Sequence, residues 1–313
     1  MCPQTITFYS NKCSKSSSCL DLHIGNYRIY TSELIRQKVC CTFCVGMTLL
    51  QDAVLGQMAA SETWPDDAAL FKPDQENQIL INENAASLAV QAFLRMCDLN
   101  IKVEGRSNAE FMSPSGKLPV LLCGKFVISE PIPIFQFVQQ KGITLSEDLS
   151  ENDQQDMKAY IQLINNTLIP AELFIMWLHR DTLKQVTWKR YGHPYPWPLN
   201  HILCFRKRHS TISYLNAIGW GTNNQSLTTI DEEVRNCCAA LSQKLADKKY
   251  FFGSKPTELD AMVYGHLYTI ITTSLPDNRL AKTIQQFGNL VAFCQNIDRD
   301  FFANCNENSE VDS

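Results

Sequence analysis

The stretch SPSGKLPVLLCGKFVISE, residues 113–130, determines the fold of the first half of this chain. A proline directly precedes an apolar strand here and follows a Ser-Pro-x-Gly turn, a pattern that favours a cis peptide bond between Leu118 and Pro119. An ordinary trans-proline at the start of a strand is the alternative. Two short strand-like runs follow, separated only by Cys123-Gly124, and they predict a hairpin.

The segments on either side of this hairpin alternate between strand and helix patterns. Residues 68–72 and 101–104 predict short strands. Between them, apolar residues recur at helical spacing over residues 85–96, with Asn82 or Asn84 as the expected N-cap. Downstream, two prolines open the predicted helix PIPIFQFVQQ. The order strand, helix, strand, hairpin, helix predicts an α/β layer built on a βαβ unit.

Strand patterns stop near residue 150, and helical patterns take over. Apolar stripes at helical spacing cover residues 157–168, 234–245, 259–272 and 284–301. Pro170 is expected to kink or end the first of these helices. The segment WKRYGHPYPWPLN, residues 188–200, contains three prolines and is predicted not to form regular helix.

These patterns predict an α+β protein of two domains. A small α/β domain is expected at residues 61–145 and an all-helical domain at residues 150–303. Residues 1–60 are expected to be an unstructured leader, and residues 304–313 an acidic tail.

Composition and charge exclude several classes of function. The net charge is −4 and 45% of the residues are hydrophobic, as in a folded protein without a nucleic-acid partner. The longest apolar run covers residues 39–50, whereas a bilayer-spanning helix needs about 20 apolar residues. The amino end also lacks the layout of a secretory signal. We therefore expect an intracellular protein whose membrane attachment is indirect or peripheral.

The 13 cysteines leave two interpretations open. Cys97, Cys237 and Cys294 fall within helical apolar patterns and are expected to be small buried hydrophobes. Cys41 and Cys44 form one C-x-x-C pair, but a structural zinc site needs a second pair of ligands at similar spacing. We expect no metal, and a redox or metal-binding leader remains the alternative.

A second informative stretch, YFFGSKPTELDAMVYG, covers residues 250–265. Thr257 and Asp260 have the spacing of a capping box, in which each side chain meets the backbone N–H of the other residue. Loss of the threonine cap is expected to cost about 1 kcal/mol. The segment therefore predicts a helix that starts after Thr257.

Together with residues 113–130, this stretch resembles the glutathione transferases, in which a thioredoxin-like domain precedes an all-helical one. The stretches NENAASLAVQAF, FMSPSGKLP, YGHPYPWPLNHIL, YFFGSKPTELDA and FGNLVAFCQNI resemble the metaxin family more closely. The likeness extends from about Met47 to Phe302, which suggests Met47 as an alternative start.

The metaxin resemblance implies a non-catalytic adaptor for protein import and β-barrel protein sorting and assembly. It implies a place on the cytosolic face of the mitochondrial outer membrane. The implied partners are a metaxin-1-like protein with its own membrane anchor and the sorting and assembly machinery. Attachment to the membrane itself would be peripheral.

The alternative is a glutathione-dependent transferase or peroxidase. Such an enzyme would need a Tyr, Ser or Cys at the start of the first helix, where only Ser87 is available. That hydroxyl is expected to bond a backbone carbonyl instead. The Glu-Ser pair that holds glutathione in the enzymes corresponds here to Glu130-Pro131, and proline has neither a hydroxyl nor an N–H. We therefore predict no enzyme, no cofactor and no catalytic residue.

An aromatic and basic segment follows residue 187 and has two interpretations. Its aromatic residues can wedge a long loop against the helical core, or the segment can form an interface with a partner or a membrane. The candidate interface residues are Trp188, Arg190, Tyr191, Tyr195, Trp197, Arg206, Lys207 and Arg208.

Overall fold

The structure is a computed structural model that describes residues 22–24, 27–29, 63–221 and 227–303. The chain divides into two compact units, Met1–Leu55 and Gly56–Ser313. In the first unit, strands β1 (Leu22–Ile24) and β2 (Tyr27–Ile29) pair as an antiparallel hairpin that the sequence pattern does not predict. The cysteines of the C-x-x-C pair lie outside the described residues.

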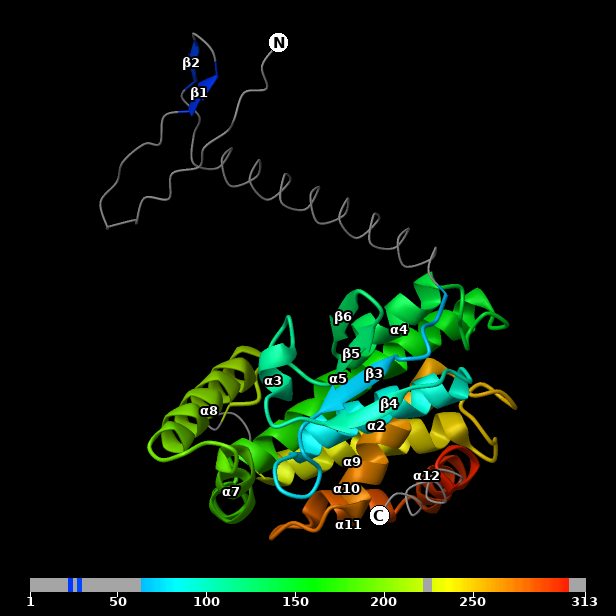
Figure 1. Cartoon of the computed structure of the whole chain (residues 1–313). Coiled ribbons are helices and arrows are strands. Elements are labelled where there is room, and N and C mark those ends of the chain that lie inside the picture. The colour runs from blue at the N-terminus through cyan, green and yellow to red at the C-terminus, as the bar shows by residue number, and fades with distance from the viewer. Residues whose placement is uncertain (1–21, 25–26, 30–62, 222–226, 304–313) are drawn as a thin grey trace, which may run out of the picture. The chain divides into compact units, whose positions relative to one another are not determined.

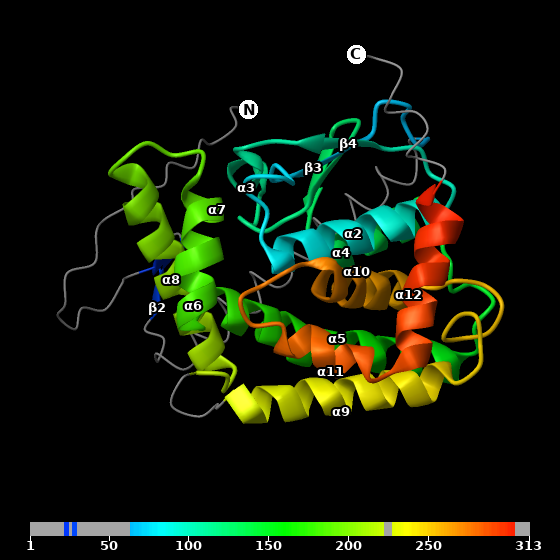
Figure 2. The same cartoon turned by 90° about the horizontal axis from the view of Figure 1, so that it is seen from below.

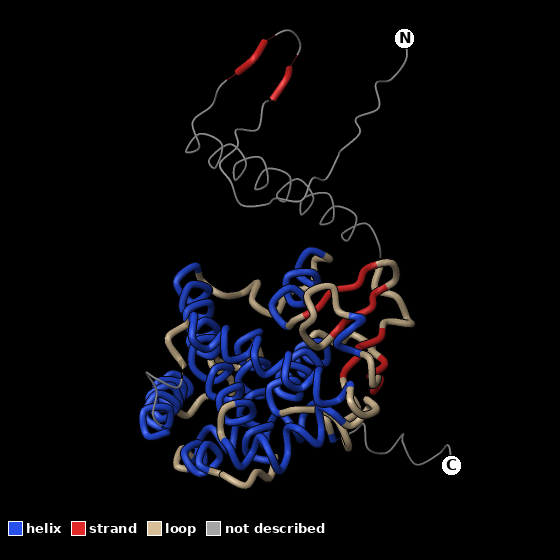
Figure 3. Tube along the Cα trace, turned by 90° about the vertical axis from the view of Figure 1, so that its left-hand side faces the viewer, coloured by secondary structure: helices blue, strands red, loops and turns tan. Residues whose placement is uncertain are grey.

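A four-stranded sheet forms one side of the second unit (Figures 1 and 3). Its strands are β3 (Ala69–Lys72), β4 (Lys102–Gly105), β5 (Val120–Cys123) and β6 (Phe126–Ser129). They lie in the order β4-β3-β5-β6, with β3 and β4 parallel and the other neighbours antiparallel. The predicted βαβ unit and hairpin are therefore present, and the Leu118–Pro119 peptide is cis as predicted.

Helices α2 (Ile81–Met96), α3 (Ala109–Met112) and α4 (Pro131–Gln140) complete this thioredoxin-like half. The prediction of Asn82 or Asn84 as the N-cap of α2 was wrong, because the N-cap is Leu80. The Glu83 carboxylate reaches back to the N–H of Leu80 at 3.5 Å, which allows the helix to begin before the asparagines. The apolar face expected over residues 85–96 is buried.

The remaining described residues form the helical half. Its elements are α5 (Glu151–Trp177), α6 (Arg180–Thr182), the π-helical turn η1 (Leu183–Thr187), α7 (Trp188–Gly192), α8 (Leu199–Ala217), α9 (Leu227–Leu245), α10 (Glu258–Thr272), α11 (Arg279–Gln285) and α12 (Gly288–Phe301). The predicted α+β architecture, a small sheet domain followed by an all-helical one, is thus confirmed.

Two local predictions in this half were wrong, and one of the two outcomes expected at Pro170 does not occur. Pro170 does not end its helix, since α5 continues to Trp177, and buried residues such as Leu168 and Ala171 anchor it on both sides. Trp188–Gly192 is helical, because the prolines that exclude helix begin only at Pro194. The last predicted helix is two helices, separated where Phe287 leaves the helical conformation before Gly288.

The two halves share one hydrophobic core. Helices α2 and α10 lie side by side (Figure 2), and Gly265 of α10 makes the approach possible. A Cβ atom at Gly265 would lie 2.5 Å from the carbonyl oxygen of Ala85 and 2.6 Å from the amide nitrogen of Ala89. The contact is therefore backbone against backbone.

In the described part of the chain, no single helix combines the length and apolarity needed to cross a membrane. The segments Glu151–Trp177 and Arg180–Gly192 meet that test only as a pair bent by 59°.

Candidate functional site

The amino end of α2 is where a glutathione transferase would hold its thiol. Ser87, the residue that sequence reasoning considered for this role, is fully buried. Its hydroxyl donates to the carbonyl oxygen of Glu83 at 2.7 Å, as expected from the sequence. The hydroxyl therefore has its proton committed to the backbone and does not point at a substrate.

The second position that would grip glutathione is Glu130-Pro131 at the start of α4. The Glu130 carboxylate forms an ion pair with Lys117 at 2.7 Å. Pro131 is the first residue of the helix and offers no N–H. The acidic side chain is thus occupied by a neighbour in the same half, and the residue after it donates nothing.

A polar bridge joins the two halves beside the amino end of α2. Glu110 of α3 accepts a hydrogen bond from the Tyr191 hydroxyl at 3.0 Å and forms an ion pair with Lys207 of α8 at 2.6 Å. The Arg190 guanidinium donates to the carbonyl oxygen of Ile79 at 2.9 Å. We call these contacts the Glu110 bridge; they tie α7 and α8 to the thioredoxin-like half.

The Glu110 bridge lies close to a buried carboxyl, that of Glu83. Burial raises the pKa of Glu83 to about 7, an effect that Lys207 opposes and Glu110 reinforces. Burial, followed by the charge of Glu110, also raises the pKa of Tyr191 above its usual range. A tyrosine whose hydroxyl already donates to a carboxylate has no proton available for a thiolate. The side chains of Glu110, Tyr191 and Lys207 therefore hold the two halves together.

We expect replacement of Glu83 to change the pH dependence of stability. The fold favours the protonated carboxyl of Glu83. The contribution of this carboxyl to the free energy of unfolding is therefore complete below pH about 4.5 and is lost as the pH rises through about 7. Glu83→Gln cannot ionise and keeps an acceptor oxygen. The free energy of unfolding of Glu83→Gln, minus that of the unmodified protein, should therefore rise by about 3 kcal/mol between pH 4.5 and pH 8.

Urea unfolding at a series of pH values measures this difference. Glu104→Gln is a control of opposite sign, because hydrogen bonds from Arg106 and then Lys102 lower the pKa of Glu104. A difference between Glu83→Gln and the unmodified protein that does not vary with pH would contradict the assignment.

The structure separates the predicted interface residues into two groups. The first group is engaged internally: Arg190, Tyr191 and Lys207 form the Glu110 bridge, Arg208 donates to the carbonyl oxygen of Trp177, Trp188 packs on His201, and Tyr195 packs on Phe111. Trp197 and Arg206 form the second group and are exposed. The wedge interpretation therefore describes most of the segment.

Sequence reasoning missed two features of this region. Glu110 was not considered, because its partners lie 81 and 97 residues further along the chain. The exposed apolar side chains of α8, among them Ile202 and Phe205, were also missed. The sequence does set this region of exposed apolar side chains apart, because residues 182–230 contain six Lys/Arg and no acidic residue.

The predicted capping box is present at the start of α10 and is deeply buried. The Asp260 carboxylate accepts from the N–H of Thr257 at 2.8 Å, from the Thr257 hydroxyl at 2.6 Å and from the N–H of Phe251 at 3.0 Å. It thereby holds both the helix and the loop that leads into it. Its role is structural.

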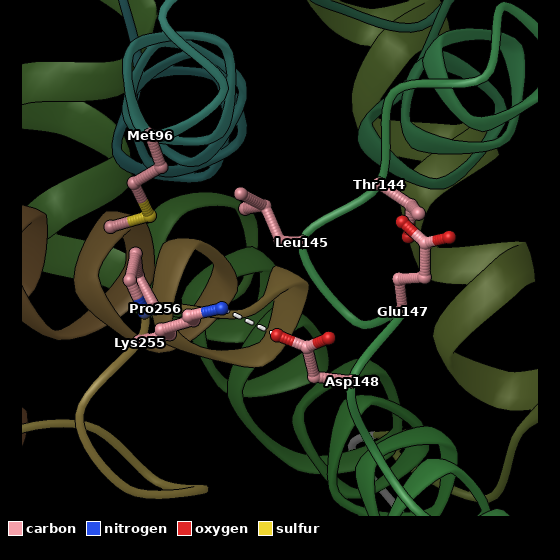
Figure 4. A pocket seen from close by; sticks show the side chains of 7 residues that line it. All are labelled: Met96, Thr144, Leu145, Glu147, Asp148, Lys255 and Pro256. Carbon is pink, nitrogen blue, oxygen red and sulfur yellow. Dashed lines mark hydrogen bonds and ion pairs between the residues drawn. The ribbon is translucent and has the colours of Figure 1, made fainter.

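A surface pocket of about 410 Å³ lies at the other end of α2 (Figure 4). Met96, Leu145 and Pro256 provide apolar walls, and Lys255 forms an ion pair with Asp148 across the opening. The other lining residues are Thr144 and Glu147. This pocket lies away from residues 81–87, and the hydrogen bond to Asp148 raises the pKa of Lys255, so its amine stays protonated and is no nucleophile.

Thiol and metal chemistry find no support among the described residues. Burial raises the pKa of Cys97 and Cys238 to about 12 and that of Cys204 to about 11, so these thiols stay protonated. No group of three or more His, Cys, Asp or Glu side chains in the described ranges could hold a metal ion.

Comparison with known proteins relates this geometry to a family. Metaxin-2 of Mus musculus is 50% identical over 256 residues, which cover 82% of this chain and 97% of that protein. The metaxin-2 homologue of Caenorhabditis elegans is 40% identical, with 72% and 95% covered. Metaxin-1 of Mus musculus is 31% identical, and 69% of each chain is covered.

Domain-level and structural comparisons agree with these relatives. The family described as "Outer mitochondrial membrane transport complex protein" matches residues 87–208, and the glutathione S-transferase C-terminal domain matches residues 234–297. The solved structure of a β-etherase from Sphingobium sp. strain SYK-6 has a TM-score of 0.52 at 12% identity. It covers 76% of this chain and 99% of its own and shows a shared fold.

The fold is that of the glutathione transferases, while the sequence follows the metaxins over nearly the whole length of a mouse relative. This chain belongs to the metaxin family, and part of it matches the family described as an outer mitochondrial membrane transport complex protein.

Proposed function

We propose that this chain is a non-catalytic adaptor subunit of a mitochondrial outer-membrane complex that imports proteins and sorts and assembles β-barrel proteins. It acts on the cytosolic face, bound to a membrane-anchored metaxin-1-like partner and to the sorting and assembly machinery. The observation that carries the non-catalytic part is the Glu110 bridge. It uses the Tyr191 hydroxyl and the Lys207 ammonium internally, beside the place where a transferase would bind glutathione.

The adaptor part is supported by family membership. The metaxin-1 relatives and the outer-membrane transport description indicate a protein that works within a complex. The two-domain fold offers large surfaces for partners, and burial raises the pKa of the Cys97, Cys204 and Cys238 thiols, which keeps them protonated. A partner-binding role therefore agrees with both the family and the chemistry of the residues.

Affinity purification after mild detergent extraction of mitochondria tests the adaptor role. We expect a membrane-anchored metaxin-1-like protein to co-elute with the tagged chain, while an abundant unrelated outer-membrane protein does not. A chain that elutes alone would count against the assignment. The same experiment on residues 47–313 tests the leader: retention of the partner would show that the leader cysteines are dispensable.

The alternative, a glutathione-dependent transferase or peroxidase, follows from the fold alone. Calorimetry with reduced glutathione distinguishes the two functions. We expect no heat of binding at millimolar glutathione, because Ser87, Tyr191 and Glu130 all have internal partners. Saturable binding accompanied by turnover of an electrophile or a peroxide would establish the enzyme instead.

A further inference from the structure

Helix α8 presents a face that the rest of the described chain does not cover. The helix packs mainly on α5 and α7 at the edge of the helical half (Figure 2). Its buried side is made by residues such as Cys204, Thr211 and Leu215. On the opposite side, Ile202, Arg206 and His209 follow one another at helical spacing, four and then three residues apart. They therefore share one outward face of the helix.

Large apolar side chains stand on this outward face and in the turn before it. Trp197, in that turn, is 79% exposed, and Phe205, Ile202 and Leu199 are 65%, 58% and 43% exposed. Single exposed apolar residues are common on soluble proteins, whereas four within nine residues concentrate exposed apolar surface at one end of α8. We call these four residues the α8 apolar face.

The charge around the α8 apolar face has one sign. Residues 182–230 carry six Lys/Arg and no Asp or Glu, whereas the whole chain has a net charge of −4, so the remaining residues together carry −10. Arg206 is exposed beside Phe205 and has no carboxylate partner among the residues that the structure describes. The carboxylate of Glu110 is already paired with Lys207 of α8 and accepts a hydrogen bond from Tyr191.

We propose that the α8 apolar face docks directly on an anionic lipid surface. Trp197, Ile202 and Phe205 would enter the boundary between headgroups and acyl chains, and Arg206 would contact lipid phosphates. Helices that lie in a membrane interface combine these two features, an apolar face and a cationic flank, and tryptophan favours the headgroup level. This contact goes beyond the proposed function, in which a protein partner holds the chain at the membrane.

The composition favours lipid over a protein partner. The cores of protein interfaces are depleted in charged residues, and their rims are polar. An acid-free segment of 49 residues in an otherwise acidic chain instead matches the negative surface potential of anionic headgroups. The family's place at the mitochondrial outer membrane brings such a surface within reach.

Vesicle flotation with the purified full-length chain tests the proposal. The probes are vesicles of phosphatidylcholine alone and of phosphatidylcholine with about one-fifth phosphatidylinositol, a fraction chosen so that anionic charge attracts nearby Lys and Arg. We expect binding to the anionic vesicles that weakens as salt screens the charges. Ile202→Ser/Phe205→Ser and, separately, Arg206→Glu should each lower the partition coefficient at least about tenfold, which corresponds to 1.4 kcal/mol.

Matched controls are available on other surfaces. Val127→Ser removes an exposed apolar side chain of β6, and Arg235→Glu reverses an exposed arginine of α9. Both should bind vesicles as the unmodified chain does. All variants change exposed side chains, so their melting temperatures should match that of the unmodified chain, which a thermal scan verifies.

Several results would overturn the proposal. These are absence of binding to anionic vesicles, equal binding to both vesicle types at every salt concentration, or equal losses in the control variants. Loss of a dimer in the α8 variants, with vesicle binding unchanged, would assign the face to a second copy. Loss of the metaxin-1-like partner with vesicle binding unchanged would assign it to that protein. Because flotation uses the chain alone, its failure leaves the adaptor role to be judged by co-purification.

Discussion

Gly265→Ala is expected to lower the free energy of unfolding by about 3 kcal/mol or more, which exceeds the usual cost of adding a methylene to a packed core. The new Cβ would lie 2.5 Å from the carbonyl oxygen of Ala85 and 2.7 Å from the Cβ of Ala89. Neither atom belongs to a flexible side chain, so α2 and α10 would have to move apart. That movement would loosen the contact between the two halves.

Gly288→Ala is the matched control for this prediction. Gly288 is also in a helix, at the start of α12, but a Cβ there would meet no atom within 4 Å. Alanine should therefore leave stability unchanged or raise it by about 0.4–1 kcal/mol. Urea unfolding followed by circular dichroism compares the two variants. Equal stabilities would show that α2 and α10 tolerate a wider spacing.

Asp260→Ala is expected to cost about 3–5 kcal/mol, since it removes the acceptor of two buried N–H groups and one hydroxyl, each worth about 1–3 kcal/mol. The carboxylate bonds Thr257 and Phe251, and all of these groups are shielded from water that could replace it. Unfolding should be measured near pH 7.5, above the value of about 6 to which burial raises the pKa of Asp260. Asp260→Asn should be milder because it retains one oxygen.

The chain contains a simpler helix cap of the same residue spacing at its surface. Ser150 and Asp153 cap α5, with the Asp153 N–H donating to the Ser150 hydroxyl at 3.2 Å. Asp153→Ala leaves groups that water can satisfy, so its cost should be about 0.5–1 kcal/mol. If the two variants are equally destabilised, burial is not what makes the Asp260 cap important.

Much of the fold could be predicted from local sequence. Pro119, the hairpin after it and the Thr257–Asp260 spacing are signals carried within a few residues, because turns, caps and short strands depend on neighbours along the chain. At one position tertiary packing overrode such a rule. Pro170 is held within α5 by buried residues on both sides, although its local preference is to break the helix.

The candidate site divides in the same way. The sequence offered only Ser87 as a nucleophile near the start of α2. The structure shows that its hydroxyl donates a hydrogen bond to the carbonyl oxygen of Glu83. The bridge from Glu110 to Tyr191 and Lys207 was not predictable. Residues so far apart meet only after the helical half has docked on the sheet half.

The sequence by itself therefore determined most of the elements between residues 68 and 301, their order, and that only the Ser87 hydroxyl stands where a transferase needs a nucleophile. Only the tertiary structure decided which of the aromatic and basic residues after position 187 are engaged internally and which remain exposed. The physical reason is that exposure depends on what packs against a side chain. The Tyr191 hydroxyl donates to Glu110, whereas Trp197, just before α8, and Arg206, within it, are exposed.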